Sequence, residues 1–249
     1  MEFFDCNCWF GLPQKRHLAP VETADRLLAE MDRAGITKAL VWHITQRECS
    51  ASAGNDFLAK AIGRRDRLTG CWTILPPQCG ETPPARELFD RMARTNLRAL
   101  RAFPSDHRYL LNRVALGPLL DEAVRAKVPL LLSVAKGAGW REVYDLLAEF
   151  PDLTCVVCDH GCWGTDRQFR PLIERYPRVY IDLAAYLLDG GIEDFVEKYG
   201  PDRMLFSTGF PDAYHGGMML ALRHAKIPKA AKRAIASGNL ERILSEARL

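Results

Sequence analysis

The stretch VPLLLSVAKGAGWREVYDLLAEFPDLTCVVCDH, residues 128–160, contains the pattern that decides the fold. It begins with an apolar run, residues 128–134, and ends with a second one, residues 154–160, each of the length of a β-strand. Between them, residues 140–150 have the period of a helix. The apolar residues of this segment share one helix face: Val143, Leu146, Leu147 and Phe150. A strand, a helix and another strand within about 30 residues are typical of a βα unit.

The same alternation continues along the chain, with about 25 to 35 residues to each strand and helix pair. Other helical segments include residues 21–34 and 116–126, and Pro or Gly stands at most of the joints. Eight strands are predicted: residues 3–9, 38–44, 68–75, 97–103, 128–134, 154–160, 179–183 and 203–207.

Eight strands alternating with helices in 249 residues predict an α/β fold, a (β/α)8 barrel of the TIM type. A doubly wound open sheet uses the same alternation, but neither G-x-G-x-x-G nor G-x-x-x-x-G-K-[ST] follows any strand, which argues against it. Because no low-complexity linker or change in composition divides the chain, residues 1–249 are predicted to form one domain. In such a barrel the chemistry takes place at the carboxyl ends of the strands.

The composition is that of an ordinary globular protein, with 48% hydrophobic and 26% charged residues. A formal net charge of +3, spread along the chain, is too small to indicate binding to nucleic acid. No apolar run approaches the roughly 18 residues of a membrane span, and the first residues lack the pattern of a signal peptide. We therefore expect a cytoplasmic protein with no nucleic-acid or membrane partner, whose eight cysteines stay reduced.

The first predicted strand carries polar residues. Because side chains alternate along a strand, Asp5, Asn7 and Trp9 are predicted to share one face, and Cys6 and Cys8 the other. The polar face suggests a site. Equally, Asp5 and Asn7 could be a buried hydrogen-bonded pair that supports the following loop.

Polar or ionisable residues also stand in or at the ends of other predicted strands: His43, Arg101, Ser133, His160 and Asp182. Several have a structural explanation, because His43 could cap a loop, Arg101 could be ion-paired and Ser133 could bond the backbone. Their coincidence at strand ends favours a functional site. After the last strand, Asp212 is a further candidate or a helix N-cap, and Tyr186 could wall an apolar pocket or belong to the core.

The sixth strand contains a C-x-x-C-x-H-x-C pattern, residues 155–162, which superficially resembles a zinc site. In an extended strand, Cys158 and His160 point to one side and Cys155 to the other, so the two thiols of C-x-x-C cannot meet on one ion. We expect no zinc site built on these cysteines. His160, where the strand meets its loop, is the better functional candidate.

Four segments together resemble the amidohydrolase superfamily, and within it the amidohydrolase-related group of barrel hydrolases and decarboxylases. DCNCWFG at residues 5–11 resembles that family's D-x-H-x-H-x-G, and MDRAGITKA at 31–39 resembles M-D-x-A-G-I-x-x-A. MLFSTGFP at 204–211 is similar to L-x-F-G-S-D-x-P, and IASGNLERIL at 235–244 to I-x-x-x-N-A-x-R-L-L. The resemblance covers almost the whole chain and implies a (β/α)8 barrel, often a homodimer.

In that family the metal ion is held by two first-strand histidines, a fifth-strand histidine or carboxylated lysine, a sixth-strand histidine and an eighth-strand aspartate. The corresponding residues here are Asn7, Trp9, Ser133, His160 and Gly209, so only His160 is retained. Asn7 and Ser133 are weak neutral ligands, while Trp9 offers only an N–H donor. We expect that the family's metal site is absent and that the Trp9 indole fills part of its volume.

The leading hypothesis is a barrel that hydrolyses or decarboxylates a small carboxylated molecule without metal. His160 would be the general base or acid, and Arg101 would bind the substrate carboxylate. One of four residues would orient the imidazole or donate a proton: His43, Asp182, Asp5 or Asp212. The predicted substrate-binding residues are Arg101, His43, Asn7, Trp9, Ser133 and Tyr186.

Two other functions stay open. A noncatalytic barrel could bind a metabolite or a protein partner, because a fold does not determine a function. The third possibility is a zinc or manganese enzyme with an unusual ligand set drawn from His160, Cys158, His43 and Asp5.

Overall fold

The computed structural model describes residues 1–15, 17–63 and 65–249. Eight parallel strands form one sheet in sequential order. Its strands are β1 (Phe4–Phe10), β2 (Lys38–His43), β3 (Leu68–Thr73), β4 (Leu97–Ala102), β5 (Leu130–Ser133), β6 (Cys155–Cys158), β7 (Val179–Asp182) and β8 (Met204–Leu205). Backbone hydrogen bonds of 3.0 Å, from the Cys6 amide to the Phe206 carbonyl and from the Trp9 amide to the Phe210 carbonyl, close the sheet into a barrel.

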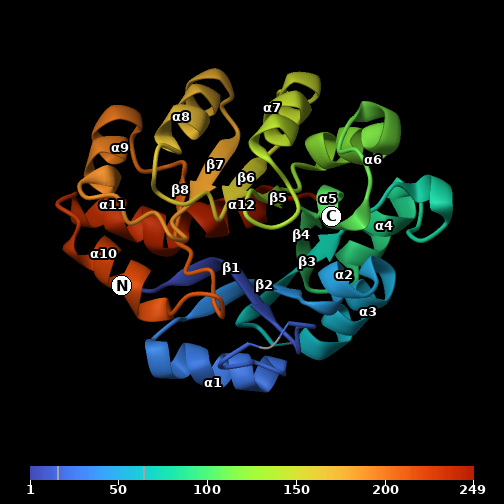
Figure 1. Ribbon diagram of the computed structural model, residues 1–249, viewed down its shortest axis with the longest axis horizontal. Coiled ribbons are helices and arrows are strands. Elements are labelled where there is room, and N and C mark those ends of the chain that lie inside the picture. The colour runs from blue at the N-terminus through green and yellow to red at the C-terminus, as the bar shows by residue number, and fades with distance from the viewer. Residues whose placement is uncertain (16, 64) are drawn as a thin grey trace.

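Helices surround the strands and complete the (β/α)8 barrel, which confirms the predicted fold class (Figure 1). They are α1 (Ala24–Ala34), α2 (Thr45–Glu48), α3 (Ala51–Ile62), α4 (Ala85–Ala93), α5 (Pro104–His107), α6 (Arg113–Ala126), α7 (Trp140–Glu149), α8 (Asp166–Arg175), α9 (Gly191–Tyr199), α10 (His215–His224), α11 (Lys229–Arg233) and α12 (Asn239–Glu246). A 3₁₀ turn, Pro77–Cys79, and a π-helical turn, Ala234–Gly238, complete the list. Over the described residues, no helix is long and apolar enough to cross a membrane.

Side-chain caps place the helix starts. The Thr23 hydroxyl accepts a hydrogen bond from the Arg26 amide over 3.1 Å, so α1 begins at Ala24, three residues after the predicted start. The Asn112 side-chain carbonyl accepts a hydrogen bond from the Ala115 amide over 3.0 Å, so α6 begins at Arg113, before the predicted residue 116. The stripe of apolar residues in the sequence was sufficient to predict both helices, whereas the N-cap residue determines where each helix begins.

The core has two apolar layers, one inside the barrel and one between strands and helices. The inner layer includes Leu240 and Ile243 of α12. Lys38 at the start of β2 pairs with Glu241 of the same helix, with Nζ and Oε1 3.0 Å apart, so α12 covers the end of the barrel where the strands begin. Polar groups are therefore left to the opposite end, where the strands finish.

The predicted alternation is confirmed for Cys155 and Cys158 of β6 and is wrong in β1. It is also wrong for His160, which packs on Phe169 and Tyr186 of the outer layer rather than on the side of Cys158. In β6, Cys158 belongs to the inner layer and Cys155 to the outer one, so the two thiols point to opposite sides. In β1 the register shifts between Asp5 and Cys8. Because of this irregularity, Cys6 and Trp9 lie together in the inner layer while Cys8 lies in the outer one, so Cys6 and Cys8 do not share a face.

Candidate functional site

One carboxylate near the carboxyl ends of the strands accepts hydrogen bonds from three side chains. It belongs to Asp159, which follows β6 and has a φ of 54°, a left-handed conformation that Asp tolerates better than most residues. Its Oδ1 accepts from Asn7 Nδ2 over 2.9 Å, and its Oδ2 accepts from Ser133 Oγ over 2.5 Å and from Lys136 Nζ over 3.2 Å. Sequence reasoning missed both Asp159 and Lys136.

The charge of Asp159 is stabilised by its surroundings. Burial alone would raise the pKa of this carboxyl group. The positive charges of Lys136 and Arg101, with hydrogen bonds from Ser133 and Asn7, hold the pKa below its usual value instead. Asp159 is therefore an ionised base at neutral pH.

Lys136 links this carboxylate to the protein surface. Its Nζ lies 3.0 Å from Oδ2 of Asp212, and the same oxygen accepts a hydrogen bond of 2.9 Å from Trp9 Nε1. The Lys136 side chain is 16% exposed and that of Asp212 41%, so the network runs from the interior to solvent. It connects the segment after β5 with the loop after β8 across the barrel mouth.

A second carboxyl group lies beneath the first. Asp182, at the end of β7, is fully buried, and its Oδ1 accepts from the Asp159 amide over 3.0 Å. Its Oδ2 lies 3.3 Å from Asn7 Nδ2. Burial, together with the negative charge of Asp159, raises the pKa of Asp182 well above its usual value. The pKa values of the two neighbouring carboxyls are thus shifted in opposite directions, a pattern that suits acid–base chemistry.

Arg101 of β4 supplies a buried positive charge below this pair. Its Nη1 donates to Asn7 Oδ1 over 2.9 Å, and its guanidinium group lies 4.8 Å from the Trp42 ring centroid and 5.4 Å from that of Phe103. Among the described residues its Nε and Nη2 atoms have no hydrogen-bond partner. Asn7 therefore connects Arg101 with both carboxyl groups.

His160 faces away from the mouth. Its Nε2 lies 2.8 Å from the Asp182 carbonyl, and its ring packs between Phe169 and Tyr186, with centroid separations of 5.1 and 5.3 Å. Burial lowers the pKa of this imidazole. The Tyr186 hydroxyl in turn donates to Asp166 at the start of α8. The left-handed turn at Asp159 sends that carboxylate into the mouth and His160 toward α8.

Asp5 supports the group around Asp159 from below, and His43 lies outside it. The Asp5 Oδ1 accepts from the Asn7 amide over 3.1 Å, so these two residues form the buried hydrogen-bonded pair that the sequence left open. The Asp5 carboxylate accepts from the Thr208 amide and hydroxyl, and so connects β1 with the segment after β8. His43 accepts from the Thr45 amide at Nδ1 over 3.2 Å and packs on Phe10. Burial lowers the pKa of His43 to about 4. Of the predicted residues, the structure brings together Asn7, Trp9, Arg101, Ser133, Asp182 and Asp212.

The residues at the family's metal positions do not fit a divalent ion. Asn7 and Ser133 donate to Asp159, and the His160 Nε2 is engaged with a backbone carbonyl. A Cβ at Gly209 would lie 3.6 Å from Asp159 Oδ1, in van der Waals contact, so the carboxylate of Asp159 already borders the position of the family's aspartate. In the described ranges no group of three or more His, Cys, Asp or Glu side chains could hold a metal ion, which includes the alternative set His160, Cys158, His43 and Asp5.

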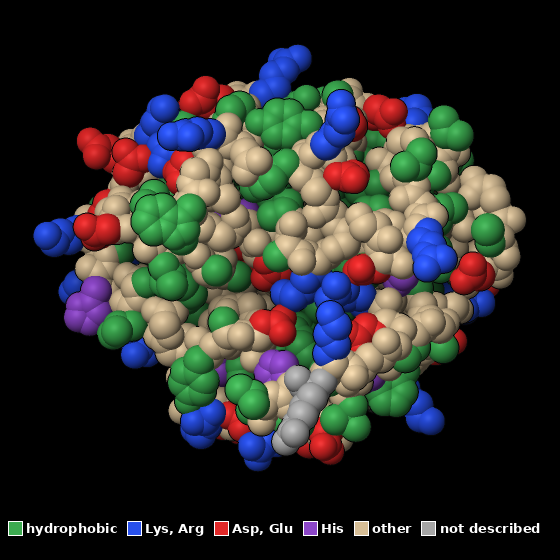
Figure 2. Space-filling view, viewed as in Figure 1, with side chains coloured by type: hydrophobic (Ala, Val, Ile, Leu, Met, Phe, Trp, Pro, Cys, Tyr) green, Lys and Arg blue, Asp and Glu red, His purple; other side chains and the backbone are tan. Residues whose placement is uncertain are grey.

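A cavity of about 190 Å³ opens over this network. Its described lining residues are Trp9, Pro13, Lys15, His17, Trp42, Ile44, Arg47, Glu48, Lys136 and Asp212. Figure 2 shows basic and acidic side chains close together near the centre of one face of the molecule. We call this cavity the mouth pocket.

Comparison with known proteins agrees with the barrel fold. The Amidohydrolase family profile matches residues 9–245. The chain belongs to this amidohydrolase family. No curated protein sequence matches the chain significantly.

Solved structures share the fold of this member of the amidohydrolase family at low sequence identity. An uncharacterised TIM-barrel protein from Bordetella bronchiseptica has a TM-score of 0.74 at 20% identity, with 99% of both chains covered. The 2,6-dihydroxybenzoate decarboxylase from Rhizobium has a TM-score of 0.74 at 17% identity, with 98% of both chains covered. The 5-carboxyvanillate decarboxylase from Novosphingobium aromaticivorans, solved with manganese and 4-hydroxy-3-methoxy-5-nitrobenzoic acid, has a TM-score of 0.74 at 15% identity over 98% of this chain and 96% of its own.

Proposed function

We propose that this amidohydrolase-family protein hydrolyses or decarboxylates a small carboxylated molecule in the mouth pocket, using its own acid, base and cationic groups in place of a metal ion. The observation that carries the proposal is the position of the Lys136 ammonium group between Asp159 and Asp212. Manganese accompanies the Novosphingobium decarboxylase. Here the fixed ammonium group would supply the positive charge at the strand ends.

The walls of the mouth pocket favour a flat carboxylated molecule. Trp9 and Trp42 provide apolar surfaces, and Lys136, Lys15 and Arg47 provide positive charges. The benzoate-type ligands of the decarboxylases with the same fold support this choice. Arg101 stays a second candidate for the substrate carboxylate, because two of its nitrogen atoms have no partner among the described residues.

In a hydrolytic reaction, the Asp159 carboxylate takes a proton from the attacking water, and Lys136 stabilises the negative oxygen that forms. In a decarboxylation, loss of CO₂ leaves a carbanion, to which the Lys136 ammonium group delivers a proton before solvent reprotonates the amine. Asp182 carries its proton below the pair, and Asn7 holds both carboxyls in place. In this proposal Asp159 takes the acid–base role predicted for His160, which becomes a positioning residue for Asp182.

The test measures turnover by chelator-treated protein. Decarboxylation of a panel of hydroxylated benzoates is monitored as CO₂ release, and hydrolysis of their esters is monitored as release of the acid. We expect Asp159→Asn and Lys136→Met to lose at least about a hundredfold in rate. Lys198→Met serves as the control, because Lys198 is an exposed lysine on α9 that pairs with Glu174. Turnover that survives in Asp159→Asn, or that appears only with added metal, would refute the proposal.

A noncatalytic binding protein is the second candidate. It is favoured by the fact that the buried charged groups already bind one another, since Asp159 is satisfied by Asn7, Ser133 and Lys136 without a ligand. Saturable binding of a benzoate to the mouth pocket, with no product after long incubation, would support this role. The homodimer implied by the family resemblance stays a prediction that sedimentation velocity tests.

A further inference from the structure

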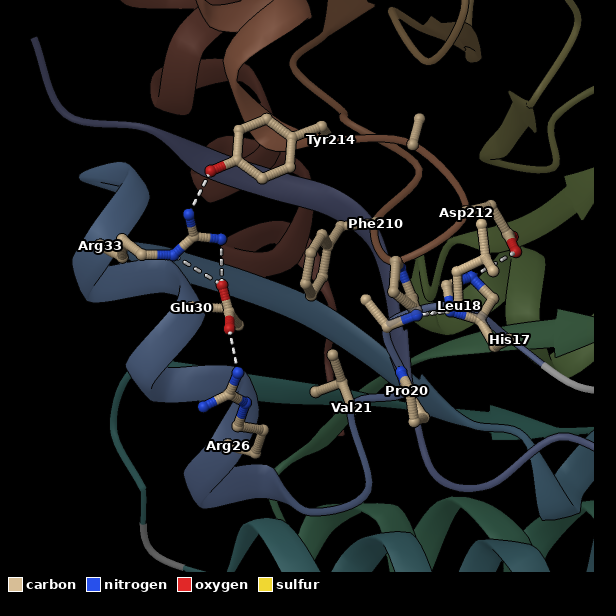
Figure 3. A pocket seen from close by; sticks show the side chains of 13 residues that line it. His17, Leu18, Pro20, Val21, Arg26, Glu30, Arg33, Phe210, Asp212 and Tyr214 are labelled. Carbon is tan, nitrogen blue, oxygen red and sulfur yellow. Dashed lines mark hydrogen bonds and ion pairs between the residues drawn. The ribbon is translucent and has the colours of Figure 1, made fainter.

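A second and larger cavity, of about 600 Å³, lies beside the mouth pocket. It lies between α1 and the loops that follow β1 and β8 (Figure 3). Val21 and Phe210 form an apolar part of its wall and are themselves almost fully buried. We call it the side cavity. Its volume falls within the range of small-molecule sites in proteins.

The wall contributed by α1 carries three charged residues on one helix face. Arg26, Glu30 and Arg33 are spaced by four and three residues, so they lie in a column that faces Phe210 (Figure 3). Glu30 Oε1 lies 2.7 Å from Arg26 Nη2, and Oε2 pairs with Arg33. One carboxylate therefore serves two guanidinium groups, which leaves this wall with an excess positive charge.

Hydrogen-bond donors on this wall stay available to a ligand. Arg33 Nη1 donates to the Tyr214 oxygen, so the Tyr214 hydroxyl is free to donate its own hydrogen. The Arg26 side chain is 62% exposed, and Glu30 is its ion-pair partner within the described ranges. Arginine donors beside an apolar surface are suited to a carboxylate on an apolar body.

We propose that the side cavity is a binding site for an organic anion with an apolar body, whose carboxylate lies on Arg26 and whose body lies on Val21 and Phe210. The site borders the Asp159 and Lys136 network through Asp212, which pairs with Lys136, but it does not depend on the chemistry proposed there. Asp212 and His17 line both cavities, so the two sites share a wall.

The experiment is isothermal titration with 2-naphthoate, which has one carboxylate and an otherwise apolar body, alongside the neutral 2-naphthamide. We expect one 2-naphthoate to bind per chain in the side cavity, and 2-naphthamide to bind there at least about tenfold more weakly. A further equivalent in the mouth pocket, where the proposed function places flat carboxylates, is identified by its loss in Lys136→Met. Arg26→Gln should weaken 2-naphthoate binding about tenfold, and Arg26→Lys less. Glu30→Gln should strengthen binding, because it removes the carboxylate that competes for both arginines.

Two control variants locate the site. Arg91→Gln removes an exposed arginine that is paired with Glu87 four residues away, just as Arg26 is paired with Glu30, and should leave binding unchanged. Lys136→Met removes a cation of the mouth pocket and should leave in place the 2-naphthoate equivalent that Arg26→Gln weakens. Equal binding of 2-naphthoate and 2-naphthamide, or loss of binding in Lys136→Met but not in Arg26→Gln, would overturn the proposal. Should Glu30→Gln fail to fold, the comparison of Arg26→Gln with Arg26→Lys decides the question alone.

Discussion

The Asp159 amide donates to the Asp182 carboxylate over 3.0 Å, and the pKa values of the two side chains are shifted in opposite directions. Asp159 is the ionised member, since Lys136 and Arg101 lie near it, while Asp182 is buried without a comparable cation. Asn7 bonds to both carboxyls and to Arg101. A residue type that is a weak metal ligand thus acts here as the link in a charged hydrogen-bond network.

Removing the ammonium group should destabilise the protein in a pH-dependent way. The folded-state pKa of Asp159 is lowered, so its contribution to stability is present above the unfolded pKa, near 4, and is lost as the pH falls through the folded value. Lys136→Met should therefore reduce the free energy of unfolding by about 2 kcal/mol at pH 7, and by less below pH 4. Urea denaturation across this range measures it, with Lys136→Arg as the variant that keeps the charge. A pH-independent loss would contradict this assignment.

Restoring the family's aspartate should be unfavourable at neutral pH. Gly209 has a φ of 68°, and a Cβ there would lie 3.6 Å from Asp159 Oδ1. Gly209→Asp and Gly209→Asn share the backbone cost, but only the aspartate adds like-charge repulsion. We expect Gly209→Asp to be less stable than Gly209→Asn by about 1 to 2 kcal/mol at pH 7, with the difference vanishing below pH 3. Equal thermal midpoints at pH 7 would show that Asp159 does not border this position.

His43 should make the fold sensitive to mild acid. Burial lowers its pKa to about 4, below the unfolded value near 6.5, so the stability it contributes is complete above pH 6.5 and is lost as the pH falls toward 4. In His43→Gln the free energy of unfolding should fall by roughly 2 kcal/mol less than in the parent as the pH is lowered from 6.5 toward 4. His224→Gln, which changes an exposed histidine of α10, should retain the parent's slope. If both variants keep that slope, His43 is not the responsible group.

The Trp9 indole should contribute more to stability than any exposed tryptophan. It is 4% exposed and bonds to Asp212, whereas Trp163 is 90% exposed. We expect Trp9→Ala to cost about 3 to 5 kcal/mol and Trp163→Ala less than about 0.5 kcal/mol. Chemical denaturation of both variants provides the comparison. A small cost at Trp9 would mean that its indole does not fill the volume between the strand ends.

Periodicity was sufficient to predict the fold, because each strand buries an apolar run and each helix an apolar stripe, as in residues 128–160. The site was only partly predictable. Asn7, Trp9, Arg101, Ser133, Asp182 and Asp212 were identified from their strand ends, and the structure brings them together. Their chemical roles depend on contacts that no spacing rule contains.

Two local irregularities hid the rest of the site. The left-handed turn at Asp159 interrupts strand alternation, so this carboxylate enters the mouth while His160 turns toward α8. The Asp-His-Gly sequence was an available signal, because Asp and Gly both accept positive φ. Lys136 lies in a loop with no periodic pattern, so only the structure could show its contacts.

Metal content per chain tests the central claim most directly. Protein produced in medium supplemented with zinc and manganese, and purified without a chelator or a chelating resin, is analysed by elemental mass spectrometry. We predict far less than one equivalent of any divalent metal in a folded protein, because Lys136 and Asp159 already balance each other at the strand ends. One equivalent of zinc or manganese that is lost in Asp159→Asn would contradict the account.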